Sequence, residues 1–152
     1  MTVATDLHEL DAWAVGLLNS LSPAGRRVLA GNIARELRRQ SQARIAAQVN
    51  PDGSAYEPRK PQVLRRKQGS IRRKMFTKLR TSRYLKAQGN ADGAVVTFVG
   101  QVQRMALVHH YGLRDRVQKD GPVVKYASRE LLGISETDQS ALADLVIAHV
   151  AR

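Results

Sequence analysis

The side chains best suited to interact with another molecule are a run of cations in the middle of the chain. Twelve Lys or Arg residues fall between Arg59 and Lys86, and this 28-residue stretch contains no Asp or Glu. The other 13 basic residues are balanced by 13 acidic ones, so the net charge of +12 arises from this basic window alone. Its members are Arg59, Lys60, Arg65, Arg66, Lys67, Arg72, Arg73, Lys74, Lys78, Arg80, Arg83 and Lys86. A concentrated block of one charge predicts contact with a negatively charged partner.

Three interpretations of the basic window are open from the residues alone. The cations could neutralise the phosphates of double-stranded DNA without reading its sequence. They could instead dock onto an acidic protein surface, or form a solvated loop, although twelve uncompensated charges repel one another. With Phe76 and Tyr84 as its aromatic residues, the window lacks the stacking platform of single-strand binders. No helix-turn-helix or zinc-finger pattern surrounds it.

Candidate catalytic and metal-binding residues are scarce. His109 and His110 are adjacent, and neighbours on a helix point about 100° apart, which suits a shared metal ion poorly. We expect one of these histidines to pack in the core and the other to face water or a neighbouring subunit. Asp115 and Asp120 lie among Arg and Lys residues, so we expect ion pairs within that loop. Because the glycines form no phosphate-binding loop and no nucleophile elbow occurs, we predict no enzyme, no metal and no cofactor.

The composition indicates one domain with an aliphatic core. A chain of 152 residues is most simply a single domain, and its 43% hydrophobic residues include few aromatics. The absence of cysteine excludes disulfides and cysteine-based metal sites. No apolar run approaches the ~20 residues that span a bilayer, and the first ten residues lack the pattern of a secretory signal. We therefore expect a soluble, cytoplasmic protein with no membrane partner.

Two helices are predicted at the N-terminal end. Residues 5–20 carry apolar side chains three and four apart, and Asp6 with Glu9 resembles a capping box. Pro23 suits the first turn of a second helix that could run to about Val49, with arginines on its outer faces. Such a helix would be roughly 40 Å long. We expect one of its faces either to be available to a neighbouring molecule or to be solvated.

The segment after the second helix begins with strong turn residues. Asn50-Pro51-Asp52-Gly53-Ser54 ends the helix, and an extended loop is expected over 50–62. Apolar residues at helical spacing from Ile71 to Leu79 predict a short helix inside the basic window.

The C-terminal half predicts a small sheet flanked by helices. The β-branched run 94–100 predicts a strand, with 83–87 as its hairpin partner and 122–126 as a further strand. Residues 101–111 should form a short helix that stops at Gly112. A last helix should begin after Ser135. The fold class is thus expected to be α+β, with long N-terminal helices packed on a small antiparallel sheet and a C-terminal helix.

Several stretches taken together resemble the phage virion morphogenesis family, and within it the tail completion proteins of contractile-tailed phages. In order, they are Arg44 to Ala46 with Asn50 to Ser54, Tyr56 and Pro58 to Lys60, then Met75 to Arg80, Val108 to Asp115 and Tyr126 to Ser135. None is distinctive alone, but their order and spacing over about residues 40–140 make the resemblance specific. Ser128 and Glu130 stand near positions where the family often has a proline.

The resemblance implies a structural protein that completes the head-proximal end of the tail and allows head–tail joining, as a tail terminator in the neck. The implied partners are the tail tube or sheath terminator, head connector proteins and packaged double-stranded DNA. Further copies of the chain would form a ring, hexameric if it follows a sixfold tail. The implied location is the virion, and the host cytoplasm during assembly.

The resemblance also assigns structural roles to individual residues. Residues 1–152 would form one tail-completion domain with a projecting basic segment at about 50–86, which orders on assembly. Leu131 and Leu132 would pack in a framework strand from Arg129 to Gly133, and the glycines would supply turn geometry. The complete set of motif residues is Asn50, Pro51, Asp52, Gly53, Tyr111, Gly112, Arg129, Leu131, Leu132 and Gly133. The open alternative is a small, non-specific double-stranded DNA-binding protein that uses residues 59–86.

Overall fold

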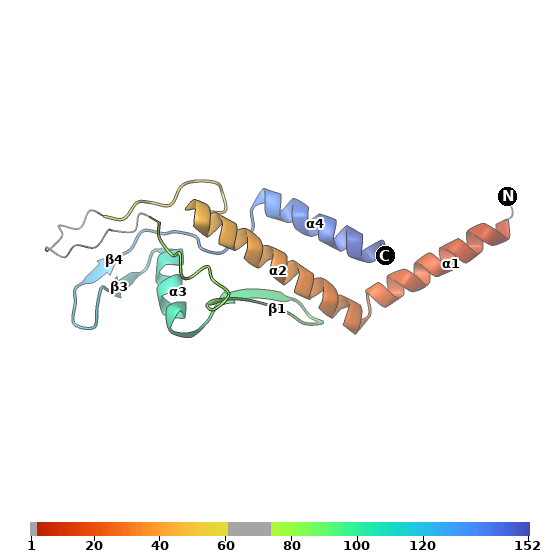
Figure 1. Ribbon diagram of the computed structural model, residues 1–152, viewed down its shortest axis with the longest axis horizontal. Coiled ribbons are helices and arrows are strands. Elements are labelled where there is room, and N and C mark those ends of the chain that lie inside the picture. The colour runs from red at the N-terminus through yellow and green to blue at the C-terminus, as the bar shows by residue number, and fades with distance from the viewer. Residues whose placement is uncertain (1–2, 61–73) are drawn as a thin grey trace. The chain divides into compact units, whose positions relative to one another are not determined.

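The computed structural model describes residues 3–60 and 74–152, with residues 3–10 described by their helical backbone alone. The helices are α1 (Val3–Ser20), α2 (Pro23–Ala47), α3 (Gln103–Tyr111) and α4 (Glu136–Val150), and a short 3₁₀ helix, η1 (Gly100–Val102), precedes α3 (Figure 1). The strands are β1 (Leu85–Gly89), β2 (Ala94–Phe98), β3 (Arg114–Arg116) and β4 (Val123–Lys125). They form two two-stranded sheets, β1 with β2 and β3 with β4. The predicted α+β class is confirmed, with two small antiparallel sheets in place of one.

The chain divides into two compact units, each assembled from separated stretches. The first contains Met1–Arg38, Ala87–Thr97 and Glu136–Arg152, and the second contains Arg39–Lys86 and Phe98–Ser135. The division falls inside α2 and inside the β1–β2 hairpin, so both elements contribute residues to both units. The expectation of a single domain over residues 1–152 stays a prediction.

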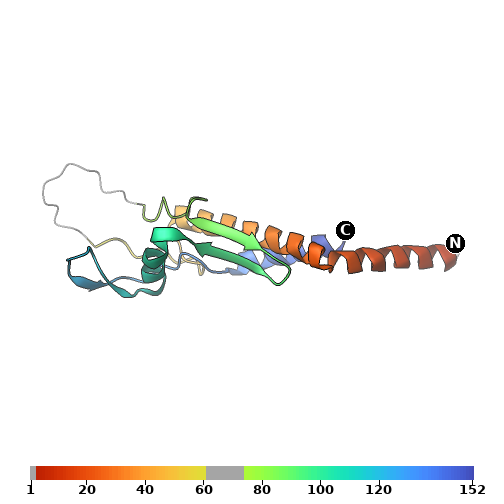
Figure 2. The ribbon, with the colours of Figure 1, turned by 90° about the horizontal axis from the view of Figure 1, so that it is seen from below.

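The first unit joins the helical ends of the chain to a hairpin. Helix α1 contacts α4, and the His149 Nε2 atom lies 3.1 Å from the Ser20 carbonyl oxygen. The turn end of the β1–β2 hairpin runs beside α2 (Figure 2), where the backbone of Gly89 lies against Ala30 and Gly31. The apolar stripe predicted for α1 is largely uncovered, because Trp13 and Leu18 are 56% and 69% exposed.

The second unit holds most of the buried apolar side chains. Ile45 of α2, Leu85 of β1 and Leu131 have no exposed surface, and they are joined by buried side chains from the turns and from α3. Those further members are Tyr56, Met75, Leu79, Phe98, Val102, Ala106 and Val108. The core is therefore built chiefly from residues that follow the middle of α2.

Most of the predicted elements are confirmed within a few residues of their expected bounds. Helices α1, α2, α3 and α4 and strands β1, β2 and β4 all occur where the sequence indicates them. Helix α3 stops at Gly112, which adopts a left-handed conformation with φ of +64°. A Cβ atom there would lie 2.9 Å from the Ser128 nitrogen, so glycine is required for two reasons.

The short helix expected from Ile71 to Leu79 is wrong over the described residues 74–79, which form turns instead. Phe76 adopts a positive φ of +63°, which a helix does not tolerate. The Gln48 side chain accepts a hydrogen bond from the Met75 N–H and donates one to the Met75 carbonyl, at 2.8 and 2.9 Å. The Gln48 side chain thus occupies the N–H and carbonyl groups of Met75 that would have bonded within a helix.

Strand β3 has no counterpart in the sequence-based prediction. It pairs with β4 antiparallel, with Arg114 opposite Lys125 and Asp115 opposite Val124. Its three residues are charged and none is β-branched, so no local signal marks it as a strand. In the part of the chain that the structure describes, no helix has the length and apolar character needed to cross a membrane.

Candidate functional site

Arg129 is a buried cation that ties two parts of the second unit together. Its side chain is only 5% exposed. Its Nε donates to the Glu57 carbonyl at 2.7 Å, and a terminal nitrogen donates to the Pro58 carbonyl at 3.2 Å. Its backbone N–H donates to the His109 carbonyl near the end of α3. Burial lowers the pKa of the guanidinium, which nevertheless remains charged at neutral pH.

Asn50 and Tyr56 hold the residue that follows Arg129. The Glu130 N–H donates to Asn50 Oδ1 at 2.9 Å, and the Tyr56 hydroxyl donates to the Glu130 carbonyl at 3.3 Å. Tyr56 is buried, and this burial raises the pKa of its phenol to about 12. Residues 50–58 are therefore packed against residues 129–130 by both main-chain and side-chain bonds.

Arg44 and Pro51 hold Gly133 in the same way. A terminal nitrogen of Arg44 donates to the Gly133 carbonyl at 2.6 Å. The backbone of Gly133 lies so close to Pro51 that a Cβ atom would come within 2.5 Å of the proline ring. The end of α2, the turn after it and residues 129–133 thus form one connected framework.

The framework strand expected from Arg129 to Gly133 is wrong. These residues belong to no strand, because their N–H groups bond elsewhere. The Glu130 N–H donates to a side-chain oxygen, and the Leu131 N–H donates to Nδ1 of His110 at 3.2 Å. Leu131 is nonetheless fully buried, as a packing role requires, whereas Leu132 is half-buried.

The remaining motif residues lie at the surface. Asp52 accepts hydrogen bonds from the Ser54 hydroxyl and N–H, and these bonds lower the pKa of its carboxyl group. Gly53 follows it with a φ of +87°, as the tight turn demands. Tyr111 is exposed, with its ring edge-on to His110 at 4.6 Å. Their roles in function stay a prediction.

Both adjacent histidines are half-buried, with different partners. The His109 ring stands between Phe76 and Tyr126, with ring centroids 4.9 and 4.8 Å away in edge-to-face geometry. Within the described residues, its buried Nδ1 atom has no hydrogen-bond partner. Burial lowers the pKa of His109, and the charge of Arg129 lowers it further. Burial also lowers the pKa of His110, whose Nδ1 accepts from the backbone.

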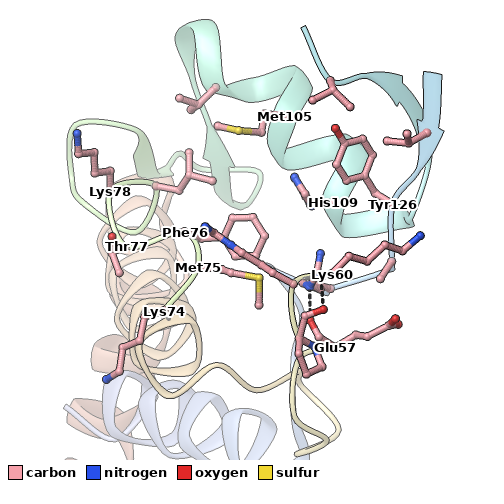
Figure 3. A pocket seen from close by; sticks show the side chains of 18 of the residues that line it. Glu57, Lys60, Lys74, Met75, Phe76, Thr77, Lys78, Met105, His109 and Tyr126 are labelled. Atoms are coloured by element: carbon pink, nitrogen blue, oxygen red, sulfur yellow. Dashed lines mark hydrogen bonds between the residues drawn. The ribbon is translucent and has the colours of Figure 1, made fainter. Parts of the chain in front are cut away.

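A pocket of about 940 Å³ lies within the second unit beside His109 (Figure 3). Met105 and His109 reach it from α3, and Met75 and Phe76 reach it from the turns before β1. Its other apolar walls come mainly from Leu79, Tyr84, Val102, Val117, Val124 and Tyr126. Its cations are Arg59, Lys60, Lys74, Lys78, Lys125 and Arg129, and Glu57 is its acidic lining residue among those described. The pocket is therefore apolar inside and basic in charge.

The basic window divides between this pocket and the remaining surface. Of its described members, Arg59, Lys60, Lys74 and Lys78 line the pocket. Arg80 and Arg83 are exposed and do not line it, and Lys86 is half-buried in β1. The other five, Arg65, Arg66, Lys67, Arg72 and Arg73, lie outside the described residues.

Asp115 forms an ion pair, but not within its own loop as we expected. Its carboxylate accepts from Arg104 of α3 at 2.6 and 3.2 Å, in a two-pronged contact. This bond lowers the pKa of Asp115 and raises that of Arg104. Across residues 3–60 and 74–152, no group of three His, Cys, Asp or Glu side chains could hold a metal ion.

Sequence reasoning missed the pocket because its walls are far apart in the chain. Met105, Val117 and Lys125 belong to α3 and the β3–β4 hairpin, which no local pattern connects to the basic window. The available signal was the occurrence of Phe76, His109 and Tyr126 in three of the motif stretches. The structure brings these three rings into one row.

Comparison with known proteins identifies relatives along nearly the whole chain. Residues 5–151 match the profile of the phage virion morphogenesis family. The tail completion protein S of Escherichia phage P2 is 41% identical over 138 residues, which cover 90% of this chain and 92% of that protein. No solved structure matches. The family range includes every motif residue, the basic window and all the residues that line the pocket.

Proposed function

The chain belongs to the phage virion morphogenesis family, and we propose that it completes the head-proximal end of a phage tail so that a head can join it. The observation that carries this proposal is the 41% identity, over 90% of the chain, to a protein named for tail completion. A relative that is similar over almost its full length supports the same task in virion assembly. We assign this chain to phage tail assembly as a structural part.

The contacts of the motif residues support a structural role rather than a catalytic one. Arg129, Arg44 and Asn50 each bond to main-chain groups of residues distant in sequence. Such bonds fix loops in place, and they occupy side chains that could otherwise act on a substrate. The protein would accordingly work by presenting surfaces, with no chemical step.

We propose that these surfaces meet the tail tube or sheath terminator and the head connector. Trp13 and Leu18 on α1 supply large exposed apolar side chains, which are typical of contact with another protein. In a ring around the tail each copy would contact the next through two different surfaces, and a sixfold tail would give a hexamer. The protein would be made in the host cytoplasm and end in the neck of the virion.

The experiment that tests the proposed function is disruption of this reading frame in its phage or prophage. Negative-stain electron microscopy of the induced lysate should show full heads beside separate tails, or tails of irregular termination. Supplying the intact chain from a plasmid should restore joined particles. Normal joined particles without the chain would contradict the proposal.

Non-specific binding of double-stranded DNA is a second candidate, favoured by the exposed cations of the basic window. It predicts retardation of duplex DNA in a gel, with affinity that falls steeply as salt increases. A neck protein could also meet packaged DNA, so DNA binding alone does not separate the two candidates. The particle phenotype does, because a protein that only binds DNA leaves head–tail joining intact.

A further inference from the structure

We propose that the pocket of the second unit binds an acidic peptide segment with apolar side chains, contributed by a neighbouring tail or neck protein. This inference deepens the proposed function and rests on it. It replaces a general basic surface with one defined site and one kind of partner.

The walls of the pocket call for apolar groups. Met75, Phe76 and Leu79 line one side and Met105 of α3 another, and Met105 is 45% exposed in the absence of a partner. A volume of about 940 Å³ lies at the upper end of the range of ligand pockets, roughly 300–1,000 Å³. Burying apolar area there is favourable in proportion to the area removed from water. This space is large enough to accept several apolar side chains of a peptide.

The charge of the pocket calls for an acidic partner. Five cations line it besides Arg129: Arg59, Lys60, Lys74, Lys78 and Lys125. Among the described lining residues, Glu57 is the one with an acidic side chain. The Arg129 guanidinium adds positive charge, but its hydrogen bonds already go to two carbonyls. Carboxylates flanking the apolar side chains of a peptide would therefore meet complementary charge, which favours fast and selective association.

His109 contributes an aromatic wall to the pocket, with its ring between those of Phe76 and Tyr126. Its Nδ1 atom is buried and lacks a hydrogen-bond partner within the described residues. A buried polar atom without a partner costs free energy, but this atom has no exposed surface, so the ring of His109, and not its Nδ1 atom, is what a bound peptide would meet.

Duplex DNA fits these features less well than a peptide. Its phosphates would satisfy the cations, but apart from thymine methyl groups in the major groove a double helix presents little apolar surface to fill the interior of the pocket. The basic residues that could track a phosphate backbone include Arg80 and Arg83, which do not line the pocket. An acidic peptide with apolar side chains matches both the positive charge and the apolar lining of the pocket, whereas duplex DNA matches the charge alone.

The first test measures binding of a fluorescein-labelled acidic peptide with a central Leu-Phe pair, by fluorescence anisotropy. The double substitution Lys74→Glu with Lys78→Glu, at the pocket, should weaken binding about tenfold, because it reverses two charges that face the peptide. The matched control is Arg80→Glu with Lys119→Glu, which makes the same charge change on exposed residues that do not line the pocket. It should change the affinity by less than about twofold. Equal losses in both variants would overturn the proposal.

The second test examines the apolar interior. Met105→Gln should weaken the same peptide about tenfold, whereas Leu107→Gln, an exposed change on the same helix, should not. Carbon-13 methyl labelling of methionine gives signals from Met75 and Met105, both in the pocket, and Met75→Leu and Met105→Leu assign them. The peptide should shift both signals. If it binds and shifts neither, the pocket is not the site and the proposal is wrong.

Two competing occupants give distinct results. The first is duplex DNA. If a DNA duplex displaces the peptide, and both charge-reversal variants lose the same affinity for DNA, the cations bind DNA and the proposal is wrong. Replacement of residues 61–73 by a Gly-Ser linker tests whether the chain occupies its own pocket. Peptide binding that appears only after this replacement would contradict a partner protein as the occupant.

Complementation of the disrupted phage separates this inference from the proposed function. Intact chain that restores joined particles, together with Lys74→Glu/Lys78→Glu that does not, supports both. If the pocket variant restores particles as well as the intact chain does, the inference fails while the function in tail completion stands. If neither disruption nor variant affects particles, the proposed function itself fails.

Discussion

Arg129 shows how one side chain can hold a protein together without taking part in any reaction. Its guanidinium donates hydrogen bonds to two main-chain carbonyls, and its main-chain N–H donates to the His109 carbonyl near the end of α3. A shorter or apolar side chain would leave those carbonyls without a partner. Burial lowers the pKa of His109, and the positive charge of the Arg129 guanidinium lowers it further.

Arg129→Met should lower the free energy of unfolding by about 3 kcal/mol, because two partly buried carbonyls lose a donor that is itself buried. Urea unfolding followed by circular dichroism measures the change. Arg80→Met removes an exposed guanidinium and should cost less than about 0.5 kcal/mol. Similar costs for the two variants would contradict the importance of the bonds made by Arg129.

The two histidines predict a loss of stability on mild acidification. Burial lowers the pKa of both below the ordinary value of 6.5, so the unfolded chain binds protons more readily than the folded chain. The stability that they contribute is complete above pH 6.5 and is lost as the pH falls from that value through the lower pKa values of the folded chain. Protonation of His110 would in addition remove the acceptor of the Leu131 N–H.

Urea unfolding at about pH 7.5 and about pH 5.5 checks this prediction. The intact chain should be less stable at the lower pH, and the double variant His109→Gln with His110→Gln should show a smaller difference. The low pKa values of Asp52 and Asp115 place their titration below this range, so they do not obscure it. An unchanged pH difference in the double variant would refute the assignment.

At the scale of elements, the turn after α2 and residues 129–133 behave as one framework. Gly133→Ala should lower the free energy of unfolding by about 2 kcal/mol, because the added methyl group would overlap the Pro51 ring. Gly93→Ala is the matched control, since nothing lies within 4 Å of the added atom there. A double-mutant cycle with Pro51→Ala should show coupling between the two sites, and additive costs would contradict the contact.

The elements that could be predicted are those whose signal is local. Helix α2 follows from Ser22-Pro23 at its start and Asn50 to Gly53 after its end, and β2 follows from its β-branched residues. Strand β3 could not be predicted, because it is a strand only by virtue of pairing with β4. The turns at 74–79 could not be predicted either, because the Gln48 side chain that holds Met75 lies 27 residues away.

The same distinction applies to the candidate site. The basic window is visible in composition, and the motif residues are visible as a resemblance. Their connection through Arg129 is a contact between residues 71 and 72 positions apart, which no local pattern reveals. The pocket is less predictable still, since α3, the β3–β4 hairpin and two stretches of loop must all be folded before it exists.

At the scale of the whole molecule, the distribution of charge sets the expected behaviour in assembly. Reversing Arg65, Arg66, Arg72 and Arg73 to glutamate should abolish joined particles in the complementation assay, because a third of the basic window then repels an acidic partner. Replacing the same four by lysine keeps the charge and should preserve assembly. Electron microscopy of both lysates gives the comparison. Infectious particles in normal number from the glutamate variant would remove these four residues from the partner-facing part of the basic window.

The single tryptophan has a consequence for spectroscopy. Trp13 is 56% exposed on α1, so its indole is already largely in water in the folded chain. Unfolding of the second unit should therefore hardly move the wavelength of tryptophan emission. For the same reason, a blue shift in this chain's own tryptophan emission, when it is mixed with purified tails that carry a non-fluorescent tryptophan analogue, would come from α1 and would mark the moment at which another protein covers it.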